Sequence, residues 1–187
     1  MTIAVFLDRD GTLVEDPGFL RDPADVRLFS GSAEAVRRLN ASRRRVVVVT
    51  NQSGLARGLI RPEEYEAVAR RVDSLLGESG AGLDATYLCP HYPPLSGPCQ
   101  CRKPGTLHFR TAAERFGLDL SACVWIGDRL TDLLPAHAFG GRGILVRTGQ
   151  GERAAEQARA EGFAVVQDLF AAVEQILLGN RRLTIDG

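Results

Sequence analysis

The chain has 187 residues, 44% of them hydrophobic, and its 23 basic and 23 acidic residues balance to a formal net charge of zero. This length fits one domain with a buried core. The balanced charge gives no overall field that would favour nucleic acid or an anionic membrane, so a role in binding either is disfavoured. The apolar run 3–7 is too short for a signal peptide or a membrane span, and we expect a cytoplasmic protein. The sequence is compatible with a monomer.

The run Ile3–Leu7 stops at two carboxylates, Asp8 and Asp10, which are followed by Gly11. Continuous apolar runs are typical of inner strands of a parallel sheet that helices cover on both faces. Ligands of such sheets bind beyond the carboxyl ends of the strands, so the two carboxylates are placed to face one pocket. Two close carboxylates are tolerated if a hard cation such as Mg²⁺ sits between them and a phosphate. The alternative interpretation is a solvated loop that carries two acids.

The remaining elements follow from hydrophobic periodicity and from Gly and Pro breakers. A turn-rich segment, Glu15–Phe19, is expected to form a short flap over the carboxylates. A helix is expected after Asp128, and Pro135 within it predicts that this helix starts late or is kinked. The tail from Arg181 is expected to be polar and loose. Further strands are predicted over residues 46–49, 85–89, 124–126 and 143–146, and helices from Ser32 to about Leu39, from Pro62 to about Leu76, and over 105–116, 157–161 and 169–178, the last ended by Gly179 and Asn180.

The strand Val46–Val49 delivers Thr50, Asn51, Gln52 and Ser53 to the same edge of the sheet as Asp8. Hydroxyl and amide donors at that edge suit phosphate oxygens. For Thr50 the alternative is a plain strand-end cap.

Three of the four cysteines crowd into thirteen residues together with a histidine. Cys89, His91, Cys99 and Cys101 provide thiolate and imidazole ligands in a Cys-x-His and a Cys-x-Cys pair, enough for a closed tetrahedral Zn²⁺ site. Because no open position is implied, we expect a structural zinc. The alternative is three free cysteines in a loop.

Lys103 is the only lysine among the 23 basic residues, and it follows the last of the four predicted zinc ligands by two positions. The ammonium of lysine, a compact and strongly hydrated charge, therefore occurs at one position in a chain whose other basic residues are all Arg. A fixed metal would aim Arg102 and Lys103 without a long ordered loop, and we hypothesise that zinc positions both side chains against the substrate. Chance survival of one lysine is the alternative.

Four motifs, in chain order, carry a family resemblance: Asp8-Arg9-Asp10-Gly11-Thr12, Thr50-Asn51, Arg102-Lys103-Pro104 and Gly127-Asp128-Arg129-Leu130-Thr131-Asp132. Together they resemble the motifs of the haloacid dehalogenase superfamily of phosphatases, from residue 3 to about residue 150. The resemblance implies an α/β, Rossmann-like parallel sheet with helices on both faces, and a single phosphatase domain over residues 1–187 with a zinc-binding loop at 89–104. No large insertion follows the first motif or the second, so no separate cap domain is expected.

The resemblance also implies roles for individual residues. Asp8 would attack phosphorus and form an aspartyl phosphate, and Asp10 would act as general acid and base. Thr50 and Lys103 would stabilise the phosphoryl group, and Asp132 would support the metal shell or cap the next helix. Magnesium would be held by Asp8, Asp10 (through its backbone carbonyl) and Asp128, and the substrate by Asp16, Pro17, Gly18, Phe19, Asn51, Gln52, Ser53, Arg102 and Arg129, with Arg102 reading a second anionic group.

Within the superfamily, the string from Asn51 to Gly54 and the zinc loop resemble the D-glycero-D-manno-heptose 1,7-bisphosphate 7-phosphatases. The implied substrate is therefore a small phosphorylated metabolite, a sugar bisphosphate. Histidinol-phosphate phosphatases share the same zinc loop and are the alternative, because the loop here is shorter than in the heptose group and Pro104-Gly105-Thr106 replaces a longer Pro-x-Pro-Gly form.

Receiver domains of signalling systems are an alternative of a different, non-enzymatic class. They also combine a parallel sheet, an acidic Mg²⁺ site, a phosphorylated Asp, a Thr and a Lys. There the phosphorylated Asp ends the third strand, whereas here the predicted third strand ends in Cys89 and leads into the zinc loop. Fold analogy alone does not decide function.

Overall fold

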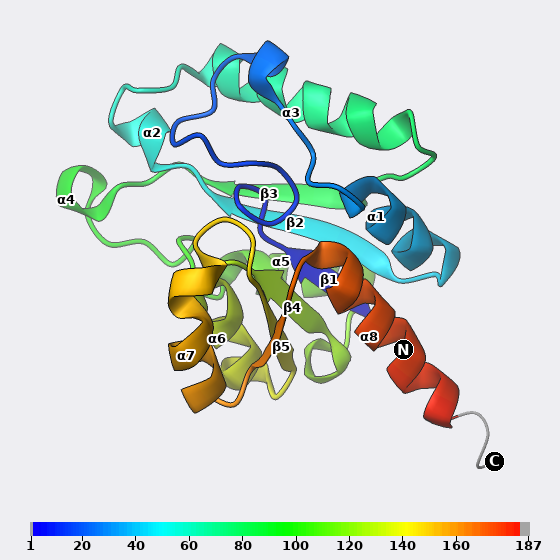
Figure 1. Cartoon of the computed structure of the whole chain (residues 1–187). Coiled ribbons are helices and arrows are strands. Elements are labelled where there is room, and N and C mark those ends of the chain that lie inside the picture. Colours follow the sequence, from blue (N-terminus) through cyan, green and yellow to red (C-terminus); the bar gives the residue numbers. More distant parts are fainter. Residues whose placement is uncertain (1, 184–187) are drawn as a thin grey trace.

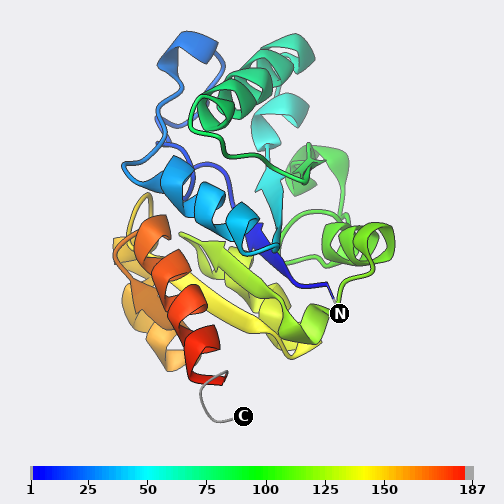
Figure 2. The ribbon, with the colours of Figure 1, turned by 90° about the vertical axis from the view of Figure 1, so that its right-hand side faces the viewer.

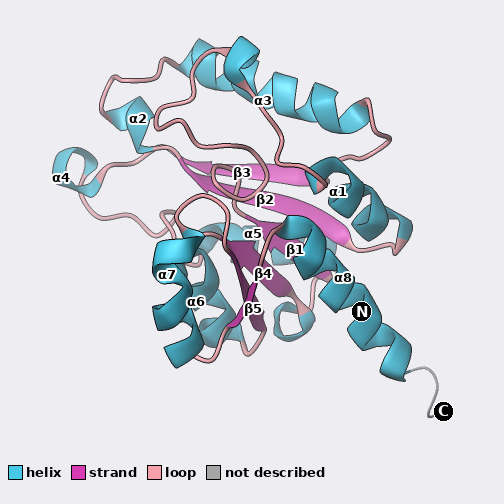
Figure 3. Ribbon diagram, viewed as in Figure 1, coloured by secondary structure: helices cyan, strands magenta, loops and turns pink. Residues whose placement is uncertain are grey.

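The computed structural model describes residues 2–183, with side chains through Leu178. Its six strands form one parallel sheet in the order β3-β2-β1-β4-β5-β6 (Figures 1 and 3). The strand order changes direction between β1 and β4, which is where ligands of open α/β sheets bind. The strands are β1 (Ala4–Leu7), β2 (Arg45–Asn51), β3 (Ala85–Cys89), β4 (Val124–Gly127), β5 (Arg142–Val146) and β6 (Ala164–Val166).

Helices cover both faces of the sheet, as two views at right angles show (Figures 1 and 2). Buried side chains of α1, α3 and α8 pack on one face, and those of α5, α6 and α7 pack on the other. The helices are α1 (Ser32–Ala41), α2 (Ser53–Ala56), α3 (Pro62–Gly77), α4 (Pro93–Ser96), α5 (Leu107–Phe116), α6 (Leu130–Phe139), α7 (Gly151–Ala160) and α8 (Leu169–Leu183), with 3₁₀ helices at Pro23–Asp25 and Leu120–Ala122.

Strand β1 shows why its sequence is apolar throughout. Val5 and Leu7 enter the core beneath α1, α3 and α8, whereas Ala4 and Phe6 enter the opposite core. Phe6 stacks on Trp125 of β4, with ring centroids 5.0 Å apart. Alternate residues therefore face two buried layers, which confirms the prediction of an inner strand.

Several predicted boundaries are wrong. Helix α7 begins at Gly151, earlier than expected, and α8 runs on through Gly179 to Leu183. A glycine inside a helix destabilises it by only about 1 kcal/mol relative to Ala, so it does not have to end one. Helix α6 includes Pro135 and starts at Leu130, so it does not start late. Strand β6 and helix α4, of three and four residues, were not predicted because such short segments show no period. The end of the predicted tail, residues 184–187, lies outside the described residues.

The connections between the first three strands bear on the expected fold class. Only a 3₁₀ helix and α1 lie between β1 and β2, and only α2 and α3 lie between β2 and β3, so neither connection carries an inserted cap domain. The strand order also differs from the 2-1-3-4-5 order of receiver domains, which removes that alternative. Within the part of the chain that the structure describes, no helix is both long enough and apolar enough to cross a membrane.

Candidate active site

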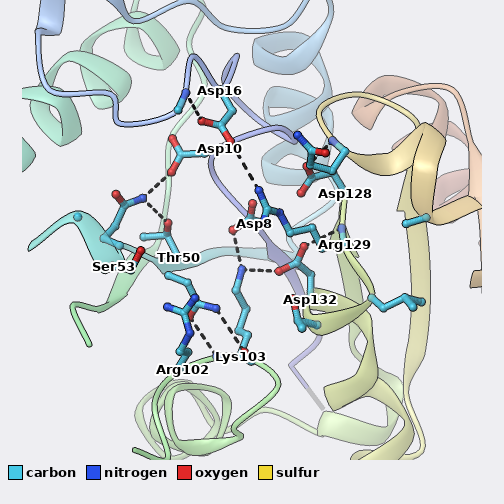
Figure 4. Close-up of a pocket in the computed structure, with 18 of the residues that line it drawn as sticks. Asp8, Asp10, Asp16, Thr50, Ser53, Arg102, Lys103, Asp128, Arg129 and Asp132 are labelled. Carbon is cyan, nitrogen blue, oxygen red and sulfur yellow. Dashed lines mark hydrogen bonds and ion pairs between the residues drawn. The ribbon is translucent and has the colours of Figure 1, made fainter. Parts of the chain in front are cut away.

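A cavity of about 940 Å³ opens at the carboxyl ends of the central strands. Figure 4 shows acidic and basic side chains converging in it from several separate segments of the chain. All the residues that the sequence placed in the catalytic, substrate-binding and magnesium sets line this cavity: Asp8, Asp10, Asp16, Pro17, Gly18, Phe19, Thr50, Asn51, Gln52, Ser53, Arg102, Lys103, Asp128 and Arg129.

The single lysine lies at the floor of the cavity, 4% exposed. Its Nζ is 2.6 Å from Oδ1 of Asp8 and 2.8 Å from Oδ1 of Asp132, and it donates to the carbonyl of Val49 at 2.6 Å. Burial alone would lower the pKa of Lys103, but the two carboxylates outweigh it and the pKa is raised, so the ammonium stays charged. Burial raises the pKa of Asp8, an effect that Lys103 opposes and that Asp132 and Asp128 reinforce.

Asp132 performs one of the two functions between which the sequence left the choice open, because it caps the following helix. Its Oδ2 accepts a hydrogen bond from the backbone N–H of Arg129 at 3.0 Å, which caps the first turn of α6. Its Oδ1 pairs with Lys103 at the same time. The residue that caps the first turn of α6 therefore also fixes the lysine.

Asp128 is fully buried at the end of β4, in a cradle of backbone. Its Oδ2 accepts the N–H of Gln150 at 2.8 Å. A Cβ added to Gly11 or to Gly149, both of which have positive φ, would lie 2.3 Å from the same oxygen. Only glycine lets the two loops approach this carboxylate so closely. Burial raises the pKa of Asp128 to about 6.

The carboxylates of Asp8, Asp128 and Asp132 fit a hard divalent cation. Their oxygens lie within 4.8 Å of one another, and the ammonium of Lys103 neutralises only one of the three charges. Oδ1 of Asp128 is buried without a hydrogen-bond partner. A buried, unpaired carboxylate oxygen beside two further carboxylates is an arrangement that Mg²⁺ would stabilise. The side chain of Asp10 is not in this group, and the sequence had assigned only its backbone carbonyl to the metal.

The carboxylate of Asp10 is hydrogen-bonded to the guanidinium of Arg9, a residue that the sequence did not predict as part of the site. Nε and Nη2 of Arg9 donate to Oδ1 and Oδ2 of Asp10, both at 3.0 Å. The amide of Gln52 donates to Oδ2 of Asp10 and, at 2.8 Å, to the hydroxyl of Thr50. Gln52 thus joins the ends of β1 and β2 across the cavity.

Asn51 ties the end of β2 to the segment that carries the lysine. Its Oδ1 accepts the backbone N–H of Lys103 at 3.0 Å, and its Nδ2 donates to the carbonyl of Lys103 at 3.3 Å. Both polar ends of the Asn51 side chain are therefore engaged by the backbone of one residue, which fixes the path of the chain at Lys103.

The flap is linked to both sides of the cavity. Asp16 lies 3.8 Å from Nη2 of Arg129 at the start of α6. The guanidinium of Arg57 lies between the rings of Phe19, from the flap, and Tyr92, from the zinc loop, 5.1 Å from each ring centroid. Such stacking contributes about 0.5–1 kcal/mol at exposed positions.

The four predicted zinc ligands are brought together where β3 ends. Sγ of Cys89 is 3.8 Å from Sγ of Cys99 and 3.7 Å from Nδ1 of His91, while Sγ of Cys101 is 3.2 Å from Cys89 and 3.1 Å from His91. A tetrahedral Zn²⁺ with ordinary bond lengths would separate two sulfurs by about 3.8 Å. None of the four cysteines forms a disulfide. The donor set therefore fits zinc, and the distance between Cys89 and Cys99 equals that separation, whereas Cys101 lies closer to Cys89 and His91.

The sequence missed one wall of the cavity, which is formed by Gln150 and by Arg153, Ala154 and Gln157 of α7. One signal was available, because Gln150 follows the carboxyl end of β5. The same rule that pointed to Asp8 and Asp128 applies there.

A family model described as HAD-hydrolase-like matches residues 100–172, the part of the chain that contains Lys103, Asp128 and Asp132. The fold and this match define the class of the protein, a haloacid dehalogenase-like hydrolase.

Similar proteins narrow the class. The chain is 38% identical, over 92% of its length and 97% of the relative's, to D-glycero-beta-D-manno-heptose-1,7-bisphosphate 7-phosphatase of Bordetella bronchiseptica. It is 40% identical to D-glycero-D-manno-heptose-1,7-bisphosphate 7-phosphatase of Thermosynechococcus vestitus, over 92% of this chain and 94% of that one. A crystal structure of the B. bronchiseptica D,D-heptose 1,7-bisphosphate phosphatase, complexed with magnesium and phosphate, matches with a TM-score of 0.87 and 37% identity over 96% of this chain and 99% of that chain. The chain therefore belongs to the family of the D-glycero-D-manno-heptose-1,7-bisphosphate 7-phosphatases.

Proposed function

We propose that this protein is a Mg²⁺-dependent phosphatase that removes the 7-phosphate of D-glycero-D-manno-heptose 1,7-bisphosphate through an aspartyl phosphate on Asp8. The observation that carries the proposal is the buried ion pair between Asp8 and Lys103, beside the partnerless oxygen of Asp128, on the floor of a cavity large enough for a sugar bisphosphate. Relatives of 38–40% identity over most of the chain bear the name of this activity. Residues 1–187 form one phosphatase domain in this proposal.

Asp8 is the nucleophile of the proposed reaction. Its carboxylate attacks phosphorus as the bond to the sugar oxygen breaks. Lys103, 2.6 Å from Oδ1 of Asp8, keeps a positive charge beside that carboxylate and beside the phosphoryl oxygens that approach it. Thr50 donates its hydroxyl proton to a phosphoryl oxygen. Mg²⁺, when bound by Asp8, Asp128 and the backbone carbonyl of Asp10, would offset the repulsion between the carboxylate and the incoming phosphate.

Asp10 moves the protons. It gives one to the leaving sugar oxygen and later takes one from the water that hydrolyses the aspartyl phosphate, so the enzyme is regenerated. Its side chain is 18% exposed and lines the cavity, which gives it access to both.

Zinc, when held by Cys89, His91, Cys99 and Cys101, would fix the loop that ends in Arg102 and Lys103. The backbone supports this coupling, because Nη1 of Arg102 donates to the carbonyl of His91 at 3.2 Å. Arg102 lines the cavity, and its planar fork suits the 1-phosphate that stays on the sugar.

The test compares phosphate release from heptose 1,7-bisphosphate and from histidinol phosphate, reported as kcat/KM with Mg²⁺ present. The proposal expects a strong preference for the bisphosphate, and it expects Arg102→Ala to reduce kcat/KM for the bisphosphate far more than for a monophosphate. Preference for histidinol phosphate would assign the chain to the alternative activity. Equal losses on both substrates would remove Arg102 from recognition of the second phosphate.

A further inference from the structure

Arg9 is a charged residue that the proposed mechanism does not use. It is 3% exposed and does not line the cavity. Its guanidinium lies over the ring of Tyr65 from α3, 5.4 Å from the centroid, and its hydrogen bonds among the described side chains go to Asp10 alone. The remaining nitrogen, Nη1, is buried without a partner. A buried, incompletely satisfied guanidinium is unfavourable for folding, so stability alone does not account for it.

The contacts of Asp10 show what this guanidinium does. A carboxylate has about four lone-pair sites, two on each oxygen. The fork of Arg9 occupies one site on Oδ1 and one on Oδ2, and Gln52 occupies the second site on Oδ2. One site on Oδ1 is left over. The three donors therefore fix the plane of the carboxylate and leave Oδ1 as the atom that can exchange a proton with the cavity.

We infer that Arg9 is a positioning residue that, supported by the ring of Tyr65, holds the carboxyl group of Asp10 for proton transfer at Oδ1. The inference rests on the proposed function, in which Asp10 protonates the leaving oxygen as the phosphorus–oxygen bond breaks. Lysine does not replace Arg9 in this role, because a point charge cannot form a planar fork with both oxygens.

The test uses two leaving groups that differ in their need for a proton. The sugar oxygen of heptose 1,7-bisphosphate must be protonated as it leaves, whereas p-nitrophenolate leaves as a stable anion. The value of kcat/KM reports the steps up to and including transfer to Asp8, and hydrolysis of the aspartyl phosphate does not enter it. A positioned general acid contributes about 10²–10⁴-fold, so Arg9→Gln is expected to reduce kcat/KM for the heptose substrate by about 100-fold or more. The value for p-nitrophenyl phosphate should stay close to that of the wild type.

Arg45→Gln is the matched control. Arg45 pairs with Asp84, whose side chain is 18% exposed like that of Asp10, and lies over the ring of Phe116 at 5.4 Å. Arg45 is not among the residues that line the cavity. Its loss should leave both values unchanged. Arg9→Lys should behave as Arg9→Gln, and Tyr65→Leu should show the same selective loss in weaker form, which keeps the test decisive if Arg9→Gln does not fold.

Equal losses on the two substrates, or no loss on either, in Arg9→Gln, Arg9→Lys and Tyr65→Leu would overturn the positioning role. The proposed function would then still stand on the activity of the wild type. A wild type that releases phosphate from neither substrate would instead refute the proposed function itself.

Discussion

Replacing Lys103 by Met tests the electrostatics of the cavity floor through stability. The change keeps most of the side-chain volume but removes three contacts of the ammonium: 2.6 Å to Asp8, 2.8 Å to Asp132 and 2.6 Å to the carbonyl of Val49. Removing one partner of a buried ion pair destabilises a protein by about 3–5 kcal/mol. We expect the lower end, about 3 kcal/mol, because Asp8, whose pKa is already raised, takes up a proton in response.

The free energy of unfolding can be measured by urea titration in magnesium-free buffer. Trp125, the only tryptophan, is 1% exposed and reports the core by its fluorescence. With a slope of about 2 kcal/mol/M, the midpoint should fall by about 1.5 M. Arg45→Met removes a partly exposed ion pair and should change stability by less than about 1 kcal/mol. A Lys103→Met midpoint shift no larger than that of Arg45→Met would refute the buried-pair interpretation.

Three further predictions concern a glycine beside Asp128, the carboxyl group of Asp128 and the cysteine cluster. Gly149→Ala should lower both stability and activity, because its Cβ would lie 2.3 Å from Oδ2 of Asp128. Gly162→Ala is the control: this glycine also has a positive φ but faces open space, so its replacement should lower stability alone. Urea midpoints measure the stability of each variant, and kcat/KM measures its activity. In magnesium-free buffer, the free energy of unfolding should fall as the pH rises from about 4 to 6, because the pKa of Asp128 is about 6 in the folded protein and lower in the unfolded chain. Mg²⁺ should abolish this fall. A free energy of unfolding that does not change with pH in the absence of Mg²⁺ would contradict the prediction. Cys99→Ser should lower zinc content after dialysis together with kcat/KM, whereas Cys123→Ala, outside the cluster, should retain zinc; unchanged zinc in Cys99→Ser would exclude that ligand.

The sequence predicted those features that depend on one strand and the residues that follow it. An inner strand of a parallel sheet must be apolar on both faces, so β1, β2 and β4 are visible as apolar runs, and the polar residues after them must meet at one edge. Asp8, Thr50 and Asp128 were found in this way, and the structure places all three on one cavity.

Features that depend on side-chain direction could not be predicted in this way. Arg9 lies in the sequence between two acidic residues that line the cavity. Only the structure shows that Arg9 itself does not line the cavity and that its guanidinium donates two hydrogen bonds to the carboxylate of Asp10. Asn51 and Gln52 line the cavity as predicted, but only the structure shows that their amides contact Lys103 and Asp10. The wall formed by α7 was missed because the helix starts with Gly151, Glu152 and Arg153, which are not apolar, so the predicted helix began only at Gln157.

Trapping the covalent intermediate tests the central claim most directly. Wild-type enzyme is mixed with heptose 1,7-bisphosphate and Mg²⁺, quenched within a turnover and reduced with borohydride, which converts an aspartyl phosphate to homoserine. Peptide mass spectrometry then locates the reduced residue. The account predicts homoserine at position 8 in the wild type, and neither homoserine nor turnover in Asp8→Asn, whose amide is a poor nucleophile. Reduction at another carboxylate, or turnover by Asp8→Asn above about a thousandth of the wild-type rate, would contradict Asp8 as the nucleophile.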